Sequence, residues 1–191
     1  GIKLAGKIIA TALKRNGLNV FAYTEYPSLI KGGHNTFQID ISDTHIESIN
    51  ENCDILLCID DKGLFEELSL INQNGSVLFD TLYKDKILTK LSEEEKQKYK
   101  FYDIPLTEIA KQNGDPKIMK NTVLIGALWS MLGLEFSNLK SVLIDFFEKF
   151  EVENINCATK GFESITKTIL SGNFVFTDNV KDNILINTKD A

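Results

Sequence analysis

The chain has 191 residues and a formal net charge of −6, and domains of about 100 to 200 residues usually have one sizeable hydrophobic core. Apolar residues make up 43% of the chain and charged residues 25%, which excludes the low hydrophobicity and high charge of disordered proteins. Nucleic acid is not expected as a partner, because proteins that bind it usually carry a clustered basic face. We therefore expect one main globular domain.

The apolar runs are too short for a membrane span. Residues 55–59 and 123–128 are among the longest, whereas a helix needs about 20 apolar residues to cross a bilayer. Residues 1–15 also lack the charged start, apolar middle and cleavage site of a signal peptide. We expect a cytoplasmic protein without membrane contact.

The first half of the chain alternates between helical and strand patterns. Apolar spacing predicts a helix over residues 2–14 that Asn16 and Gly17 end. Residues 18–23 and 36–41 have strand composition, with an unusual connection over 25–35. A strand over 54–60, a helix over 64–72, a turn at 74–75 and a strand over 76–82 follow.

This alternation favours a sheet covered by helices, with right-handed crossover connections. The predicted fold class is α/β, a three-layer sandwich whose central sheet is mostly parallel or mixed and carries helices on both faces.

The second half is predicted to be mainly helical. Residues 91–100 form a solvated helical turn capped by Ser92, and 106–112 form a short helix. Residues 117–132 and 138–150 form two longer amphipathic helices. Beyond residue 150 the pattern weakens to a helix over 160–170, a short edge strand over 174–176 and a linker over the last ~15 residues. We expect a core domain over 1–150 and a C-terminal extension and linker over 151–191.

The connection over 25–35 contains the strongest candidate site. It gathers Lys31, Gly32, Gly33, His34 and Asn35 within a few positions. Paired glycines let the backbone reach positive φ and approach a ligand, and their N–H groups together with a lysine suit a phosphate or carboxylate. Alternatively, the glycines form a turn in which the histidine and asparagine satisfy local backbone groups.

Three weaker candidates lie elsewhere. Gly1 starts the first helix, where free N–H groups attract anions. Asp60 and Asp61 follow a buried strand, so they face a ligand or cap the next helix. Lys120 and Asn121 precede an apolar run that contains a glycine at position 126, which permits either close packing of a helix on the sheet or ligand contact.

Neither a metal site nor an independent catalytic site is expected. His34 and His45 lack a zinc-ligand spacing. Cys53, Cys58 and Cys157 form no CxxC pair, which argues against a disulfide framework or a cysteine-ligated cluster. The sequence also lacks the GxSxG, HExxH and P-loop motifs of self-sufficient hydrolases and nucleotidases.

Two segments carry a family resemblance. The opening GIKLAGKI and the later YTEYPSLIKGGHN, at residues 23–35, resemble the gamma domain of 2-oxoacid:ferredoxin (acceptor) oxidoreductases, in the form fused ahead of the alpha domain. The resemblance covers roughly residues 1–150. It departs from the family at the start, where Gly1 alone represents the glycine-rich turn and the first strand is missing. A piece of a longer polypeptide, extended both ways, is therefore expected.

The resemblance implies an activity shared among several parts. Such enzymes decarboxylate a 2-oxoacid on thiamine diphosphate, pass electrons through iron–sulfur clusters to ferredoxin and deliver the acyl group to coenzyme A, as in anaerobic metabolism. Thiamine diphosphate, magnesium and the clusters are expected on the alpha and beta partners, with none held by this chain. The chain alone is then inactive, and the pocket that selects the 2-oxoacid lies outside it.

The resemblance assigns this domain to coenzyme A handling and subunit assembly. Lys31 and loop N–H groups would hold the phosphates of coenzyme A, while Tyr26 and His34 shape the pantetheine path or a subunit contact. Two alternatives stay open: a purely structural assembly domain, and a free-standing nucleotide-binding protein. The residues of the expected coenzyme A site are Gly1, Tyr26, Pro27, Ser28, Lys31, Gly32, Gly33, His34 and Asn35.

Overall fold

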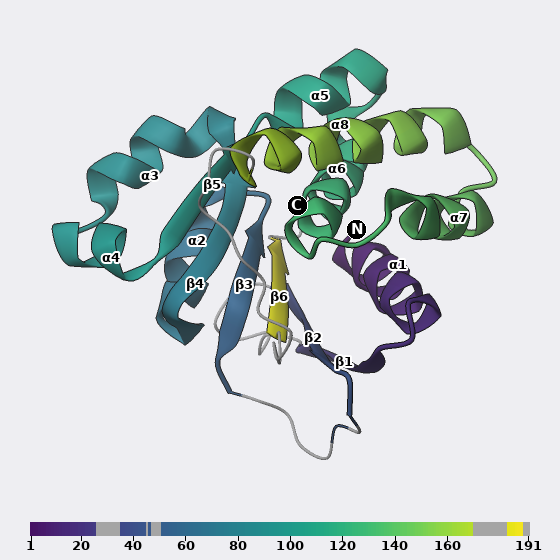
Figure 1. Ribbon diagram of the computed structural model, residues 1–191. Coiled ribbons are helices and arrows are strands. Elements are labelled where there is room, and N and C mark those ends of the chain that lie inside the picture. Colours follow the sequence, from purple (N-terminus) through teal and green to yellow (C-terminus); the bar gives the residue numbers. More distant parts are fainter. Residues whose placement is uncertain (26–34, 45, 47–50, 170–182, 189–191) are drawn as a thin grey trace.

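The computed structural model describes residues 1–25, 35–44, 46, 51–169 and 183–188. Its elements follow the chain in this order (Figure 1): α1 (Ile2–Arg15), β1 (Asn19–Glu25), β2 (Asn35–Ser42), β3 (Cys53–Cys58), α2 (Asp61–Glu67), the 3-10 turn η1 (Leu68–Leu70), β4 (Ile71–Asp80), the 3-10 turn η2 (Thr81–Tyr83), α3 (Lys84–Lys90), α4 (Glu93–Lys98), β5 (Lys100–Ile104), α5 (Leu106–Asn113), α6 (Pro116–Met131), α7 (Phe136–Phe146), α8 (Glu151–Ile169) and β6 (Asn183–Thr188).

The six strands form one mixed sheet in the order β1-β2-β6-β3-β4-β5. Strand β2 is antiparallel to both of its neighbours, whereas β6, β3, β4 and β5 run parallel to one another. The four parallel strands therefore end at one edge, where β1 also ends and β2 begins. We call this the carboxyl edge; its strand termini are Glu25, Asn35, Cys58, Asp80, Ile104 and Thr188.

Helices cover both faces of the sheet, which confirms the predicted α/β three-layer sandwich. On the first face, α1 and α5 to α8 pack on apolar strand residues such as Ile39, Leu57 and Leu78. On the second face, α2 and α3 pack on Leu56 and Val77. Figure 1 shows α2, α3 and α4 on one side of the sheet and α1, α6 and α7 on the other.

Strand β2 has one apolar face and one polar face, because successive side chains of a strand point to opposite sides. The polar side chains are nevertheless buried. Tyr23 Oη donates to Gln38 Oε1 over 2.9 Å, and Gln38 Nε2 donates to Asp40 Oδ1 over 3.1 Å. Hydrogen bonds between strand side chains thus satisfy polar groups that the sheet removes from water.

Two local predictions are confirmed. Helix α1 ends where expected, with Asn16 Nδ2 donating to the Ala12 carbonyl over 2.8 Å and Gly17 at φ 85°. Ser92 begins α4 through a capping box, in which its hydroxyl and the Glu95 carboxylate bond each other's backbone N–H. Both signals act within one helical turn.

The helix predicted over 64–72 and the turn at 74–75 are partly wrong. Helix α2 and η1 end by residue 70, and β4 already begins at Ile71. Asn74 has φ 66°, and the pairing of β4 with β3 shifts register between Cys53 and Ile55. Pairing with β3 therefore continues through a bulge at the position where local composition predicted a turn.

Strand β5 has no counterpart in the sequence-based prediction, which placed no strand between the helical turn over 91–100 and the helix over 106–112. Its Phe101 ring meets the Phe79 and Tyr99 rings edge-on, each with 6.4 Å between centroids. Strand β6 lies within the stretch predicted as a linker, yet it pairs with both β2 and β3. Contacts distant in sequence determine both strands.

Helix α8 begins at residue 151, nine positions before the predicted helix, and packs closely on α6. A Cβ at Gly126 would lie 1.9 Å from the Ala158 carbonyl oxygen, and one at Gly161 would lie 1.9 Å from the Val123 carbonyl oxygen. Gly126 thus permits close packing on α8 rather than on the sheet. The strand predicted over 174–176 lies outside the described residues, and the domain division at residue 150 stays a prediction.

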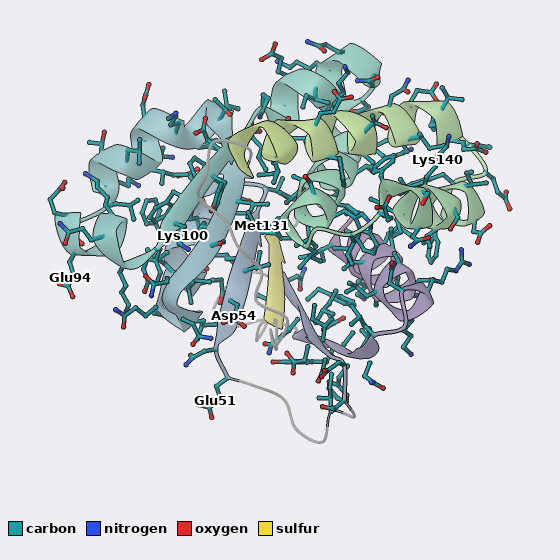
Figure 2. The ribbon with its side chains drawn as sticks, viewed as in Figure 1. Glu51, Asp54, Glu94, Lys100, Met131 and Lys140 are labelled. Atoms are coloured by element: carbon teal, nitrogen blue, oxygen red, sulfur yellow. The ribbon has the colours of Figure 1, made fainter. Side chains whose placement is uncertain are left out.

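Apolar side chains lie inside the molecule and charged side chains on its surface. Figure 2 shows Met131 inside the molecule, where it is buried, while Glu94 and Lys140 point outward from α4 and α7. Within the described ranges, no helix combines the length and apolar character needed to cross a membrane.

Candidate functional site

Most of the predicted coenzyme A site lies outside the described residues: Tyr26, Pro27, Ser28, Lys31, Gly32, Gly33 and His34. The structure does fix both ends of this segment. Strand β1 ends at Glu25, which pairs with Thr36, and β2 begins at Asn35, which pairs with Thr188. The segment therefore leaves and re-enters the sheet at the carboxyl edge, next to the end of β6.

The start of α1 lies at the same edge. A Cβ at Gly6 would come within 2.4 Å of the Phe37 ring, so the first turns of α1 pack against the beginning of β2. Gly1 is exposed and its carbonyl accepts the N–H of Ala5 over 3.2 Å. The first turn of α1 has no acidic side chain and contains Lys3, which keeps the positive potential of this helix end available for an anion.

Asp80 organises the next part of the carboxyl edge. It ends β4 with 1% exposure, and its carboxylate accepts the backbone N–H groups of Leu82 and Thr107, each over 3.3 Å. The Thr107 hydroxyl also donates to it, and Lys120 Nζ lies 3.9 Å away. A buried carboxylate thus ties the starts of η2 and α5 to the second turn of α6.

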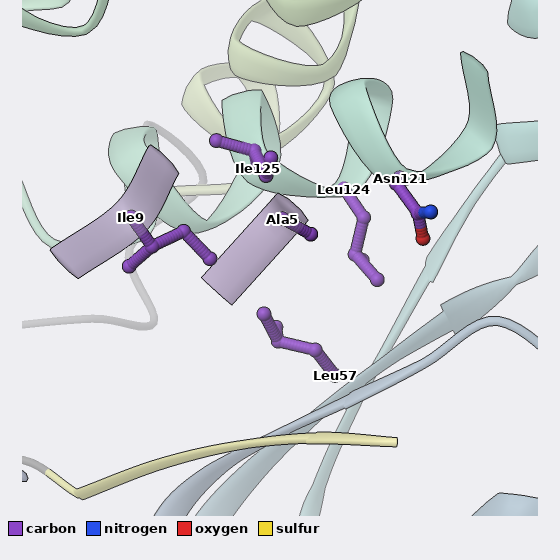
Figure 3. A pocket seen from close by; sticks show the side chains of 6 residues that line it. All are labelled: Ala5, Ile9, Leu57, Asn121, Leu124 and Ile125. Carbon is purple, nitrogen blue, oxygen red and sulfur yellow. The ribbon is translucent and has the colours of Figure 1, made fainter. Parts of the chain in front are cut away.

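Lys120 and Asn121 lie in the second turn of α6 and form its side of the site. The Lys120 side chain is 20% exposed and reaches toward Asp80. Asn121 lines one end of a small gap between α1, α6 and β3, whose other lining residues include Ala5, Leu57 and, at the far end, Ile9 (Figure 3). The structure therefore brings the first turns of α1 next to Asn121 and the end of β4 next to Lys120, although these patterns in the sequence were separate and weak.

Asp60 and Asp61 are structural. Asp60 caps α2 by accepting the Gly63 N–H over 2.9 Å, as one alternative from the sequence expected. Burial alone would raise the pKa of Asp61, but the Lys86 ammonium, 2.5 Å away, hydrogen-bonds its carboxylate and lowers that pKa. Burial, and then the charges of Asp80 and Asp60, raise the pKa of Tyr83, so this phenol stays protonated at neutral pH.

The three cysteines are buried, and burial keeps them in the thiol form. Burial raises the pKa of Cys53 to about 12 and that of Cys157 to about 11, and burial also raises the pKa of Cys58, whose side chain is fully buried. Only a thiolate attacks or ligates efficiently. In the described part of the chain, no group of three or more histidine, cysteine or acidic residues is arranged to hold a metal ion.

The arrangement suits binding rather than bond breaking, since it offers a helix start, a lysine, an amide and a buried anchoring carboxylate. Sequence reasoning missed Asp80 and Thr107. The signal for Asp80 was the one that marked Asp60, an acidic residue at the end of an apolar strand run. Thr107 gave no signal, because its role depends on the end of a strand 27 positions earlier.

Comparison with family models matches residues 1–164 to the family described as pyruvate ferredoxin/flavodoxin oxidoreductase. This chain belongs to that family. The match covers α1 through most of α8, so it includes most of the first face of the described sandwich. Within the family, the chain corresponds to the gamma domain, as the resemblance in residues 1–8 and 23–35 implied.

Two curated relatives agree with this assignment. The 2-oxoglutarate synthase subunit KorC of Methanocaldococcus jannaschii is 30% identical over 169 residues, which cover 85% of this chain and 87% of that subunit. The 2-oxoacid:ferredoxin oxidoreductase subunit alpha of a Sulfolobus species is 36% identical over 66 residues, 35% of this chain. The matched stretch spans only 10% of the length of that alpha subunit.

Two solved structures share the fold. The gamma subunit of a keto/oxoacid ferredoxin oxidoreductase from Geobacter sulfurreducens has a TM-score of 0.70 at 23% identity, covering 86% of this chain and 90% of its own. The 2-oxoglutarate:ferredoxin oxidoreductase from Magnetococcus marinus, solved with 2-oxoglutarate, coenzyme A and succinyl-CoA, has a TM-score of 0.75 at 24% identity. The likeness covers 93% of this chain and 31% of that one.

Proposed function

We propose that this chain is the gamma-type part of a 2-oxoacid:ferredoxin oxidoreductase, and that its carboxyl edge helps to bind coenzyme A. The reaction is the oxidative decarboxylation of a 2-oxoacid to an acyl-CoA, with electrons passed to ferredoxin. Family membership and the gamma-subunit relatives support the enzyme class. The coenzyme A bound to the Magnetococcus enzyme, whose fold this chain shares, supports the cosubstrate.

One observation supports the placement of the site. The segment with Lys31, Gly32 and Gly33 leaves β1 and enters β2 at the edge where α1 also starts. In open α/β sheets, ligands bind outside the carboxyl ends of the strands, and helix starts and glycine N–H groups suit phosphates. We assign the phosphates of coenzyme A to Lys31, the glycines and the start of α1 at Gly1.

The other residues of the motif shape the path of the ligand or a contact with a partner. Tyr26, Pro27, Ser28, His34 and Asn35 are assigned to the pantetheine path or to contact with the alpha part. Thiamine diphosphate, magnesium and the iron–sulfur clusters belong to the alpha and beta parts, so this chain has no catalytic residue of its own. The proposal places the protein in the cytoplasm.

A measurement of coenzyme A binding to the assembled enzyme tests this assignment. Lys31→Ala should weaken binding about 10- to 100-fold, because hydrogen bonds to charged groups contribute about 1.5–3 kcal/mol. The loss should shrink as salt rises, since salt screens charge pairs. Lys140→Ala, an exposed lysine on α7, is the matched control and should leave the dissociation constant unchanged.

The alternative of a purely structural assembly domain predicts a different result. In that case Lys31→Ala would leave the dissociation constant for coenzyme A unchanged and would instead weaken assembly with the alpha part, as measured by analytical ultracentrifugation. That outcome would overturn the coenzyme A assignment while leaving the enzyme class intact.

A further inference from the structure

The two edges of the sheet differ in how they are protected. Within the described sheet, β1 and β5 are the outer strands, and each pairs with one neighbour only (Figure 1). An outer strand presents backbone N–H and C=O groups on its free side, and native proteins usually block such an edge with charges, proline, a bulge or a short strand. Strand β5 follows this rule, because it has five residues and carries Lys100 and Asp103.

Strand β1 has none of these protections. Its seven residues pair with β2 in an unbroken register and include no proline, and residues 19–24 carry no charge. Phe21 is 43% exposed, and Ala22 is exposed as well. A long, uncharged edge with an exposed aromatic ring is one that a further strand readily extends. We therefore expect another strand to cover this edge in the assembled protein.

The order of side chains along β1 indicates which strand fits. When the sequence NVFAYTE is laid antiparallel to a copy of itself, Ala22 lies opposite its own counterpart. Phe21 then faces Tyr23 of the other copy, and Val20 faces Thr24. Aromatic and β-branched pairs of this kind stabilise antiparallel strands. All seven residues of each strand pair in this register, so β1 is complementary to itself.

The charges at the two ends of β1 fit the same orientation. Helix α1 ends with Lys14 and Arg15 just before β1 begins, whereas β1 ends with Glu25. Antiparallel pairing brings the acidic end of each strand toward the basic end of the other, and the uncharged residues between them face no like charge. A second copy arranged in this way is related to the first by a two-fold axis, the commonest symmetry of protein oligomers.

We propose that β1 pairs antiparallel with β1 of a second copy of this chain, about a two-fold axis at Ala22. The two sheets then form one continuous sheet across the dimer. Backbone hydrogen bonds between the two edges supply the affinity, and the side-chain pairs set the register. This interface is independent of the coenzyme A assignment, because none of the residues assigned to coenzyme A lies on β1.

Cysteine substitutions in the assembled enzyme test this register. On mild oxidation with diamide, Ala22→Cys should link two copies of the polypeptide by a disulfide, because Cβ atoms directly opposite each other lie about 4.5–5.5 Å apart. Val20→Cys alone and Thr24→Cys alone should not, since each lies four positions, about 14 Å, from its own counterpart. The double variant Val20→Cys/Thr24→Cys should link again. The wild type controls for the three buried native cysteines.

Non-reducing gel electrophoresis measures the linked dimer, and activity after reduction shows that each variant folds. Linking by Ala22→Cys and by the double variant, at a yield that about tenfold dilution does not lower, is the expected result. If Ala22→Cys stays unlinked but reacts with iodoacetamide, the edge is open to solvent. If it stays unlinked and unreactive, a different chain covers the edge. Either result overturns the proposal, as does equal linking by the two single-site controls.

Discussion

Replacing Gly126 by alanine should destabilise the protein, although alanine favours helix more than glycine does. The added Cβ would lie 1.9 Å from the Ala158 carbonyl oxygen and 2.6 Å from the carbonyl carbon. Both atoms belong to the backbone of α8, so no rotation of a side chain relieves the clash. Ordinary contact begins near 3.4 Å, so the two helices would have to separate by about 1.5 Å, the difference between 3.4 and 1.9 Å.

The magnitude follows from two opposing terms. Overpacking of a close contact typically costs about 1–3 kcal/mol. Because the clash here is with backbone atoms, which cannot rotate away, we expect a cost of about 3 kcal/mol. The gain in helix propensity from glycine to alanine is about 1 kcal/mol. The net loss is about 2 kcal/mol, which lowers the thermal midpoint by about 4–8 °C for a chain of this length.

Thermal unfolding followed by circular dichroism measures this loss, with Gly133→Ala as the control. A Cβ at Gly133 meets nothing within 4 Å, but φ is 66°, so the control should lose only about 1 kcal/mol from the left-handed backbone. Gly161→Ala introduces a clash at the same contact between α6 and α8, this time from α8. The double variant should therefore lose less stability than the sum of the losses of the two single variants. A thermal midpoint for Gly126→Ala at or above that of the wild type would refute the close packing of α6 on α8.

Two further predictions concern titratable groups. Cys53, Cys58 and Cys157 should all resist Ellman's reagent at pH 8 in the native protein and react fully in urea, because burial raises each thiol pKa; fast labelling of the native protein would contradict this. The lowered pKa of Asp61 in the folded state contributes stability above the unfolded pKa of about 3.9, and that stability is lost as the pH falls through the folded pKa. Lys86→Met should therefore lower the urea midpoint at pH 7 but not at pH 2, and an equal loss at both values would show that Lys86 acts through packing alone.

The sequence by itself determined the features that depend on neighbours within a turn or two. The apolar spacing of residues 2–14 predicted α1, because a helix that packs on a sheet repeats its buried face every three to four residues. Ser92 and Gly17 marked helix ends through bonds that close locally. The motif at residues 23–35 indicated the family, which comparison with the family model confirmed.

Only the tertiary structure decided which separate segments meet. Strand β6 lies between β2 and β3 although more than a hundred residues separate it from either, and a short strand's composition does not name its partners. Asp80 gained its role when β4 placed it beside Thr107 and Lys120. Burial, and pairing between residues distant in sequence, arise only when the layers pack together, so local sequence patterns do not predict them.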